Sequence, residues 1–227
     1  MKILSYWKPY EIIWLLLFCG MAVYITVATG DNLFGFFVFL SGVLCVLLAA
    51  KGSIMTYIVG IFNTVGYAWL AWQNGLFGEV GLNMLFYMPM NFIGFFLWKG
   101  HMDKSIVRMR RLNRRNILTA AVICVVGTML LGLALSLLSG QNTPYLDAST
   151  NVLSVVATFL MIWRFREQWA CYIILNVLSV IMWGLRWADG SPDGLLMVVM
   201  WSAYLVNAVY GMYNWTKGSK AQEAAAV

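Results

Sequence analysis

Charged side chains are scarce in this sequence, and the middle of every long apolar run lacks them altogether. Charged residues make up 11% of the chain, hydrophobic residues make up 62%, and the mean hydropathy is +0.77. Carriers driven by protons or sodium usually need an ionisable group or a dedicated ion site within the membrane. This absence argues against ion-coupled transport as the function of the chain.

Motifs for catalysis and cofactor binding are absent too. The one histidine, His101, stands alone in a basic stretch, and no Ser-His-Asp set or metal-spaced cluster accompanies it. No glycine-rich phosphate loop occurs, which argues against ATP drive by this chain. The four cysteines lie inside apolar runs without C-x-x-C spacing and indicate packing. We therefore expect no enzyme, no cofactor and no metal site.

Long apolar runs, in contrast, fill most of the chain. They fall at about 12–29, 33–50, 54–72, 80–98, 117–138, 149–163, 169–187 and 194–215. Each is close to the length that a helix needs to cross a hydrocarbon core of about 30 Å, and the alternation typical of barrel strands is missing. Backbone groups in lipid must be paired within their own segment, so the sequence predicts an all-α polytopic membrane protein with about eight transmembrane helices.

The basic residues predict how these helices are oriented. With eight spans both termini lie on one side of the membrane, and 14 of the 15 Lys and Arg residues fall on that side, leaving only Arg186 opposite. The positive-inside rule makes the rich side cytoplasmic, so we expect both termini inside. The basic stretch 99–115 is then a solvated cytoplasmic loop that can touch anionic lipid of the bilayer, and we expect no nucleic-acid partner.

An internal repeat points most strongly to function. Its first copy contains Asn63, Trp69, Tyr87, Gly94 and Trp98, and its second contains Asn176, Trp183, Tyr204, Gly211 and Trp215. The single run between the copies crosses the membrane once, so both copies begin outside, end inside and are parallel. Two similar halves are typical of transporters that hold substrate between the halves. The competing interpretation is that duplicated helices only pack alike and carry no pathway.

The repeat predicts a division of the chain into five parts. We expect an N-terminal tail with an extra helix at 1–32, a first three-helix repeat at 33–98, and a basic cytoplasmic loop with a linker helix at 99–148. A second three-helix repeat follows at 149–216, and a cytoplasmic tail at 217–227. The tail beyond Trp215 is short, polar and rich in alanine, which predicts disorder.

Polar and aromatic side chains at mid-depth form the candidate substrate site. Asparagine in hydrocarbon is costly unless it has a partner. The predicted substrate-binding residues are Asn63, Tyr87, Asn91, Asn176, Trp183, Tyr204, Asn207 and Tyr210. Hydrogen bonding between helices is an equally open interpretation for Asn63 and Asn176. Asn91 and Asn207 each share a helix face with a tyrosine, which favours a pathway.

Proline and tryptophan add two local predictions. Pro89 removes a backbone donor and is expected to loosen its helix at a point where a gate would bend. Tryptophans near the predicted cytoplasmic ends are expected mostly to be interface anchors. These are Trp7, Trp14, Trp98, Trp163, Trp169 and Trp215.

One segment of the second half carries a family resemblance. It reads Trp163-Arg164-Phe165-Arg166-Glu167-Gln168-Trp169 and is followed by Asn176, Tyr204, Asn207, Tyr210, Gly211 and Trp215. Over about residues 12–216 the chain resembles the PnuC family of bacterial vitamin B3 transporters, which carry nicotinamide riboside. The resemblance implies a SWEET-like 3+1+3 architecture in the bacterial inner membrane. It also implies a homotrimer and trapping of the substrate by a separate soluble riboside kinase.

The residues and the resemblance together predict facilitated diffusion of nicotinamide riboside. Aromatic faces can hold its pyridinium, and asparagines match its amide and hydroxyls. A phosphorylated nucleotide is disfavoured, because no Arg or Lys lies at mid-depth to meet a phosphate. The alternatives are a facilitator of the same fold for another vitamin or a sugar and, more remotely, a membrane-embedded enzyme or scaffold.

Overall fold

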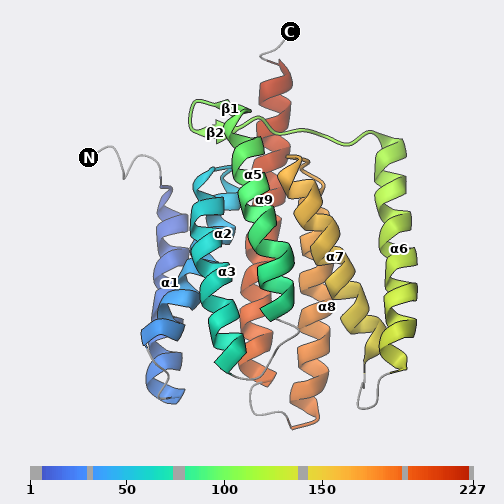
Figure 1. Cartoon of the computed structure of the whole chain (residues 1–227). Helices are drawn as coiled ribbons and strands as arrows, with labels where there is room; N and C mark the ends of the chain where they lie inside the picture. Colours follow the sequence, from blue (N-terminus) through green and yellow to red (C-terminus); the bar gives the residue numbers. More distant parts are fainter. Residues whose placement is uncertain (1–6, 30–32, 74–79, 138–142, 191–193, 225–227) are drawn as a thin grey trace. The chain divides into compact units, whose positions relative to one another are not determined.

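In the part of the chain that it describes, the computed structural model consists of helices and one short hairpin (Figure 1). It describes residues 7–29, 33–73, 80–137, 143–190 and 194–224. Its helices are α1 (Pro9–Thr29), α2 (Leu33–Ala50), α3 (Met55–Gln73), η1 (Leu82–Tyr87), α5 (Met88–Lys99), α6 (Arg114–Ser136), α7 (Pro144–Ile162), α8 (Gln168–Ala188) and α9 (Gly194–Ala224). Because η1 runs directly into α5, these make eight helices over the described ranges, and the predicted all-α fold is confirmed.

Helix length and composition separate these helices into two kinds. Among the described residues, α2, α6, α7 and α8 are long and apolar enough to span a membrane by themselves, and α1 contains a shorter apolar stretch. The helices that contain Asn63, Asn91 and Asn207 fall outside that group. Polar residues in a transmembrane helix usually face the interior of the bundle.

Two features near the ends of helices differ from the sequence prediction. The prediction of a disordered tail beyond Trp215 is wrong, because α9 continues as helix to Ala224. The basic loop contains an unpredicted antiparallel hairpin of β1 (Met102–Asp103) and β2 (Ile106–Val107).

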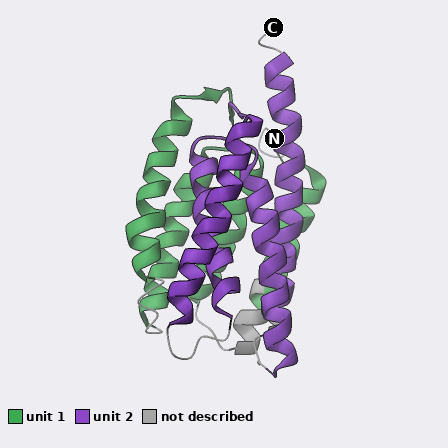
Figure 2. Cartoon of the chain, turned by 90° about the vertical axis from the view of Figure 1, so that its right-hand side faces the viewer, with its two compact units in different colours: residues 1–107 green, residues 108–227 purple. Residues whose placement is uncertain are grey.

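The chain forms two compact units, residues 1–107 and residues 108–227 (Figure 2). In the first unit α1 packs on α2, α2 on α3, and α3 on α5. In the second unit α6 packs on α7, α7 on α8, and α8 on α9. Each unit is therefore a chain of four helices with the same order of neighbours. The first helix holds the place in its unit that the linker helix holds in the other.

The same aromatic contact closes both units. In the first unit the Tyr57 ring lies against Gly94 and meets the Trp98 ring edge-on at 4.9 Å between centroids. In the second unit the Trp169 ring lies against Gly211 and meets the Trp215 ring edge-on at 6.4 Å. Each glycine leaves room for a ring, because a methyl group in its place would overlap the ring atoms. The repeated Gly-x3-Trp spacing thus serves helix packing.

This contact corrects the expectation for three tryptophans. Trp98 and Trp215 have no exposed surface, and Trp169 is 3% exposed. They are packing residues of the helical units, and the prediction that they anchor the chain at the interface is wrong. Trp163, which is 52% exposed, remains available for such a role.

Pro89 does loosen its helix, as predicted. The π-helical segment η1 ends just before it, and the Met88 N–H donates to the Asn83 carbonyl five residues back. Proline has no N–H and its ring would collide with the carbonyl four residues earlier. A π-turn removes that collision by shifting the hydrogen-bond register.

A buried ion pair fastens α1 to the end of α2. Lys51 Nζ lies 2.5 Å from Glu11 Oε2, and both side chains are nearly inaccessible. The same carboxylate oxygen accepts the Lys8 N–H at 2.8 Å, and the Trp7 ring covers the Lys51 ammonium at 4.5 Å. Each buried charge is therefore paired and further satisfied, which a buried pair requires.

Equivalent turns follow α2 and α7. Gly52 and Arg164 both adopt a left-handed conformation, with φ of 69° and 65°. The next residue donates its N–H back across the turn in each case, from Ser53 to the Leu48 carbonyl and from Phe165 to the Leu160 carbonyl. These are the hydrogen bonds of a Schellman motif. Glycine suits this position, whereas Arg164 adopts it at a cost.

Residues 107–112, which we call the connecting strand, join the two units. Val107 donates its N–H to the Gly52 carbonyl at 3.0 Å, and Arg110 donates its N–H to the Arg164 carbonyl at 2.7 Å. Each unit thus holds its own end of the strand at its own left-handed turn.

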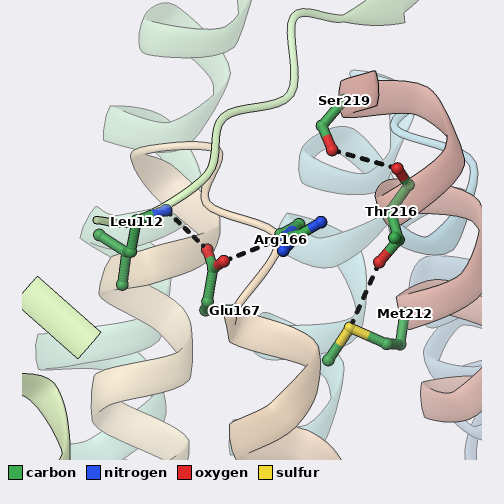
Figure 3. A network of polar contacts seen from close by, with 6 residues as sticks. All are labelled: Leu112, Arg166, Glu167, Met212, Thr216 and Ser219. Atoms are coloured by element: carbon green, nitrogen blue, oxygen red, sulfur yellow. Dashed lines mark hydrogen bonds and ion pairs between the residues drawn. The ribbon is translucent and has the colours of Figure 1, made fainter. Parts of the chain in front are cut away.

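The second unit holds the strand through side chains as well. Glu167 accepts the Leu112 N–H at 3.0 Å and also pairs with Arg166 at 3.1 Å (Figure 3). Gln222, in the extension of α9, accepts the Met109 N–H at 2.7 Å. The helical tail therefore holds the connecting strand, and this contact explains why the tail is ordered.

Candidate functional site

The predicted site residues of the first unit lie on three helical segments. Asn63, on α3, donates its amide to the Val38 carbonyl at 2.8 Å and to Ser41 Oγ at 3.1 Å, both on α2. Asn91, on α5, donates to Thr64 Oγ1 on α3 at 3.1 Å. These two amides tie neighbouring helices together and contact different partners.

The aromatic member of this group, Tyr87, is the last residue of η1. Its ring meets that of Phe86 edge-on at 5.0 Å and is partly exposed. The π-helical register therefore sets where Tyr87 lies relative to Asn91, one turn further on. Sequence spacing alone treats the two as neighbours on a regular helix, and the register shift changes that angle.

The predicted asparagines of the second unit are more deeply placed. Asn176 on α8 and Asn207 on α9 are each 4% exposed. Ser179, one turn from Asn176, is 1% exposed, so α8 buries a short polar stripe at mid-helix. Buried amides of this kind either bond between helices or face a polar solute.

Three predicted aromatic residues accompany these asparagines. Tyr204 lies edge-on to Trp201 at 5.7 Å, and Tyr204 and Tyr210 are partly exposed on α9. Trp183 on α8 is partly exposed, and the Arg186 guanidinium lies over its ring at 4.8 Å from the centroid. Arg186 Nη2 in turn approaches Asp147 Oδ1 at 3.8 Å. Trp183 thus already presents its face to a planar cation.

Gln168 is a candidate that the sequence prediction did not single out. It begins α8, has no exposed surface, and its amide nitrogen and oxygen have no hydrogen-bond partner among the described residues. An amide in that state costs stability unless a polar group meets it. The signal in the sequence was its place within the segment Arg166-Glu167-Gln168-Trp169, where a polar residue precedes a long apolar run.

A family model, curated sequences and a solved structure all relate this chain to the same group of proteins. A family model described as a nicotinamide mononucleotide transporter matches residues 32–217. The chain is 38% identical over 220 residues to the nicotinamide riboside transporter PnuC of Haemophilus influenzae, covering 95% of this chain and 93% of that one. It is 36% identical over 217 residues to the namesake of Neisseria mucosa, with coverage of 93% and 82%.

A solved structure agrees with these relatives. The crystal structure of the vitamin B3 transporter PnuC matches with a TM-score of 0.77 at 36% identity, covering 94% of this chain and 93% of that one. The predictions of a multi-pass membrane transporter, and of a protein that is not an enzyme, are thereby confirmed. Sequence and fold agree along almost the whole length, and the chain belongs to the PnuC family of bacterial nicotinamide riboside transporters.

Proposed function

We propose that this chain moves nicotinamide riboside across the bacterial inner membrane by facilitated diffusion. The observation that carries the proposal is the identity of 38% to a nicotinamide riboside transporter over nearly the full length of both chains. Relatives that differ in substrate would be expected to differ in the residues that line the pathway, so the identity of the substrate needs a test of its own.

The position of charge supports transport without an ion gradient. In the described helices the ionisable acidic and basic side chains lie near helix ends, as with Glu11 at the start of α1 and Arg186 at the end of α8. Ion-coupled carriers place such groups, or a dedicated ion site, at mid-depth. Movement down the substrate's own concentration gradient needs neither.

The proposed substrate contacts are aromatic faces for the pyridinium and amides for the rest. Stacking of Arg186 on Trp183 supports the first part, because it shows that this ring accepts a flat cation. We assign substrate contact to Asn63, Tyr87, Asn91, Asn176, Trp183, Tyr204, Asn207 and Tyr210. For Asn63 and Asn91 the assignment coexists with the helix contacts already described.

The mononucleotide is the second candidate, because the matching family model carries its name. Its phosphate would need a cationic partner in the pathway. Arg186 is the one Lys or Arg residue that the predicted topology places away from the cytoplasmic side. Its guanidinium is engaged with Trp183 and Asp147. The charge pattern therefore favours the unphosphorylated riboside. A carrier of the same fold for another vitamin or a sugar is the further alternative.

Assembly and trapping complete the proposal. We propose a homotrimer, as the family resemblance implies, and α6 leaves an apolar side exposed on which either lipid or a neighbouring protomer could pack. Because facilitated diffusion does not by itself concentrate a solute, accumulation beyond equality requires that a separate kinase phosphorylate the riboside inside the cell.

Titration calorimetry on purified protein tests the substrate. We expect saturable binding of nicotinamide riboside that is not displaced by thiamine, riboflavin or glucose and is displaced only weakly by nicotinamide mononucleotide. Tighter binding of the mononucleotide than of the riboside would reverse the assignment. Displacement by thiamine or riboflavin at comparable concentration would move the protein to the other-vitamin alternative.

A further inference from the structure

An open groove lies along an exposed face of α9, next to α8, within the second unit. Its volume is about 500 Å³. The lining residues are Ile173, Val209, Met212, Tyr213, Thr216, Lys217 and Lys220. One residue comes from α8 and the others from α9, so the groove belongs to two helices that pack directly on each other.

The groove changes character along the helix. The part nearer the N-terminus of α9 is apolar, and its Val209 and Tyr213 are 53% and 62% exposed. The end nearer the C-terminus of α9 carries Lys217 and Lys220, which are both exposed and lie three residues apart on one face of the helix. From Val209 to Lys220 the helix rises roughly 16 Å at about 1.5 Å per residue. The apolar part thus leads to a pair of ammonium groups at the membrane boundary.

The two lysines have no acidic partner in the described part of the chain. Neither forms an ion pair there, and the nearest acid along α9, Glu223, is exposed and forms none either. At the adjoining start of α8, Glu167 is engaged by Arg166 and by the Leu112 N–H. The positive charge of Lys217 and Lys220 therefore faces outward without local neutralisation.

Two hydroxyl groups at this part of α9 form hydrogen bonds within the helix. The Thr216 hydroxyl donates to the Met212 sulfur at 3.7 Å, and Ser219 donates to the Thr216 carbonyl at 3.2 Å (Figure 3). The groove therefore offers an apolar wall and two cations. A matching ligand has a long apolar body and an anionic head.

A second groove, in the first unit, provides a contrast. It has a comparable volume of about 590 Å³ and is lined by Phe34, Ile58, Ile61, Phe62, Val65, Gly66 and Trp69. No charged side chain lines it, so it suits acyl chains of any lipid and selects no headgroup. The lysine pair is what distinguishes the groove on α9.

We propose that the α9 groove binds an anionic phospholipid, with Lys217 and Lys220 at the headgroup phosphate and an acyl chain along Val209 and Met212. Basic residues at the cytoplasmic end of a transmembrane helix attract anionic lipid, and tyrosine is enriched at the level of the lipid headgroups. The proposal does not depend on the transported substrate. It gives the ordered end of α9 a second role beside holding the connecting strand.

Native mass spectrometry of the purified full-length protein tests the site. Phosphatidylglycerol and phosphatidylcholine with the same acyl chains are titrated into wild type, Lys217→Gln, Lys220→Gln and the double variant. Each lysine removed is expected to weaken phosphatidylglycerol binding about fivefold, so the double variant weakens it roughly 25-fold. The matched control, Lys99→Gln with Lys104→Gln, removes two exposed lysines of the first unit and should leave binding unchanged.

Three results would overturn the proposal. The first is equal retention of phosphatidylcholine and phosphatidylglycerol by the wild type. The second is unchanged phosphatidylglycerol affinity in the double variant, or displacement of the lipid by millimolar inorganic phosphate, which would mark a site for free anions. The third is an altered oligomer mass in the double variant without bound lipid, which would make the groove a contact between protein copies.

Discussion

At the residue scale, Trp183 and Arg186 show how this chain handles a cation near an aromatic ring. The guanidinium lies 4.8 Å from the ring centroid, and Asp147 is 3.8 Å from one of its nitrogens. A cation over an aromatic face contributes about 0.5–1 kcal/mol at an exposed site. If Trp183 also holds the substrate's pyridinium, Arg186 competes for the same face.

Arg186→Gln is therefore expected to tighten nicotinamide riboside binding. Removing about 0.5–1 kcal/mol of competition corresponds to roughly two- to fivefold in Kd. Titration calorimetry measures this, with Lys104→Gln as a control for loss of one positive charge elsewhere. In a Trp183→Leu background the gain should vanish, because the ring that the two cations share is gone. An equal gain in affinity in that background would show that Arg186 affects binding independently of Trp183.

Single residues also mark the limit of what the sequence could predict. The sequence predicts Asn63 and Asn91 at mid-depth from their position in apolar runs, with hydrogen bonding between helices an equal alternative for Asn63 and a pathway favoured for Asn91. The structure supplies the partners, Val38, Ser41 and Thr64. Those partners depend on how helices pack, which spacing along one helix does not contain.

At the element scale, the two units are closed by the same small-residue contact. Gly94 receives the Tyr57 ring and Gly211 receives the Trp169 ring. Buried tryptophans stand edge-on to both rings. The Gly-x3-Trp spacing is therefore a packing motif, which accounts for the equal spacing of the two residues in both copies.

Gly94→Ala and Gly211→Ala are each expected to destabilise the protein by about 1–3 kcal/mol through overpacking. The measurement is the thermal unfolding midpoint in detergent. Gly184→Ala is the matched control, because no atom lies near its added methyl group and alanine favours helix. Midpoints for the first two variants equal to that of Gly184→Ala would show that the rings yield freely.

The elements themselves follow the sequence closely where apolar length decides. Helix α2 has the predicted bounds, and α3 and α8 differ from prediction by a single residue at each end. One misjudged part is the tail, which is helical because Gln222 and Gly218 meet Met109. Its polar composition does not indicate that contact. The loosening at Pro89 was predicted, and the structure adds that it takes the form of a π-turn.

At the scale of the whole molecule, the chain consists of two units with one order of helix packing. Helix α1 packs on the first repeat helix of its unit as α6 does in the other unit, so the extra first helix is the counterpart of the linker helix. The connecting strand is fixed on both sides of Arg108, at Val107 in one unit and at Met109 in the other. Alternating access usually proceeds by movement of one repeat against the other. Such movement would have to be accommodated at Arg108.

Insertion of Gly-Ser between Arg108 and Met109 tests this consequence. We expect a several-fold lower transport rate with unchanged substrate affinity and thermal midpoint, because slack is added without breaking either set of hydrogen bonds. The control places the same insertion between Asp189 and Gly190, in an exposed turn where Gly190 has φ of 88°. Equal rates for both insertions would show that the short connection is not needed for turnover.

The central claim is uncoupled movement of nicotinamide riboside, and its most direct test is uptake into proteoliposomes that have no ion gradient. With equal K⁺ on both sides and valinomycin present to dissipate the potential that entry of a cation builds up, labelled riboside should enter until the inner and outer concentrations are equal, at a rate that proton and sodium ionophores leave unchanged. Riboside preloaded inside should accelerate entry by exchange. Enclosing a riboside kinase with ATP should drive accumulation beyond equality. Uptake that requires a proton or sodium gradient, or accumulation beyond equality without the kinase, would contradict the account.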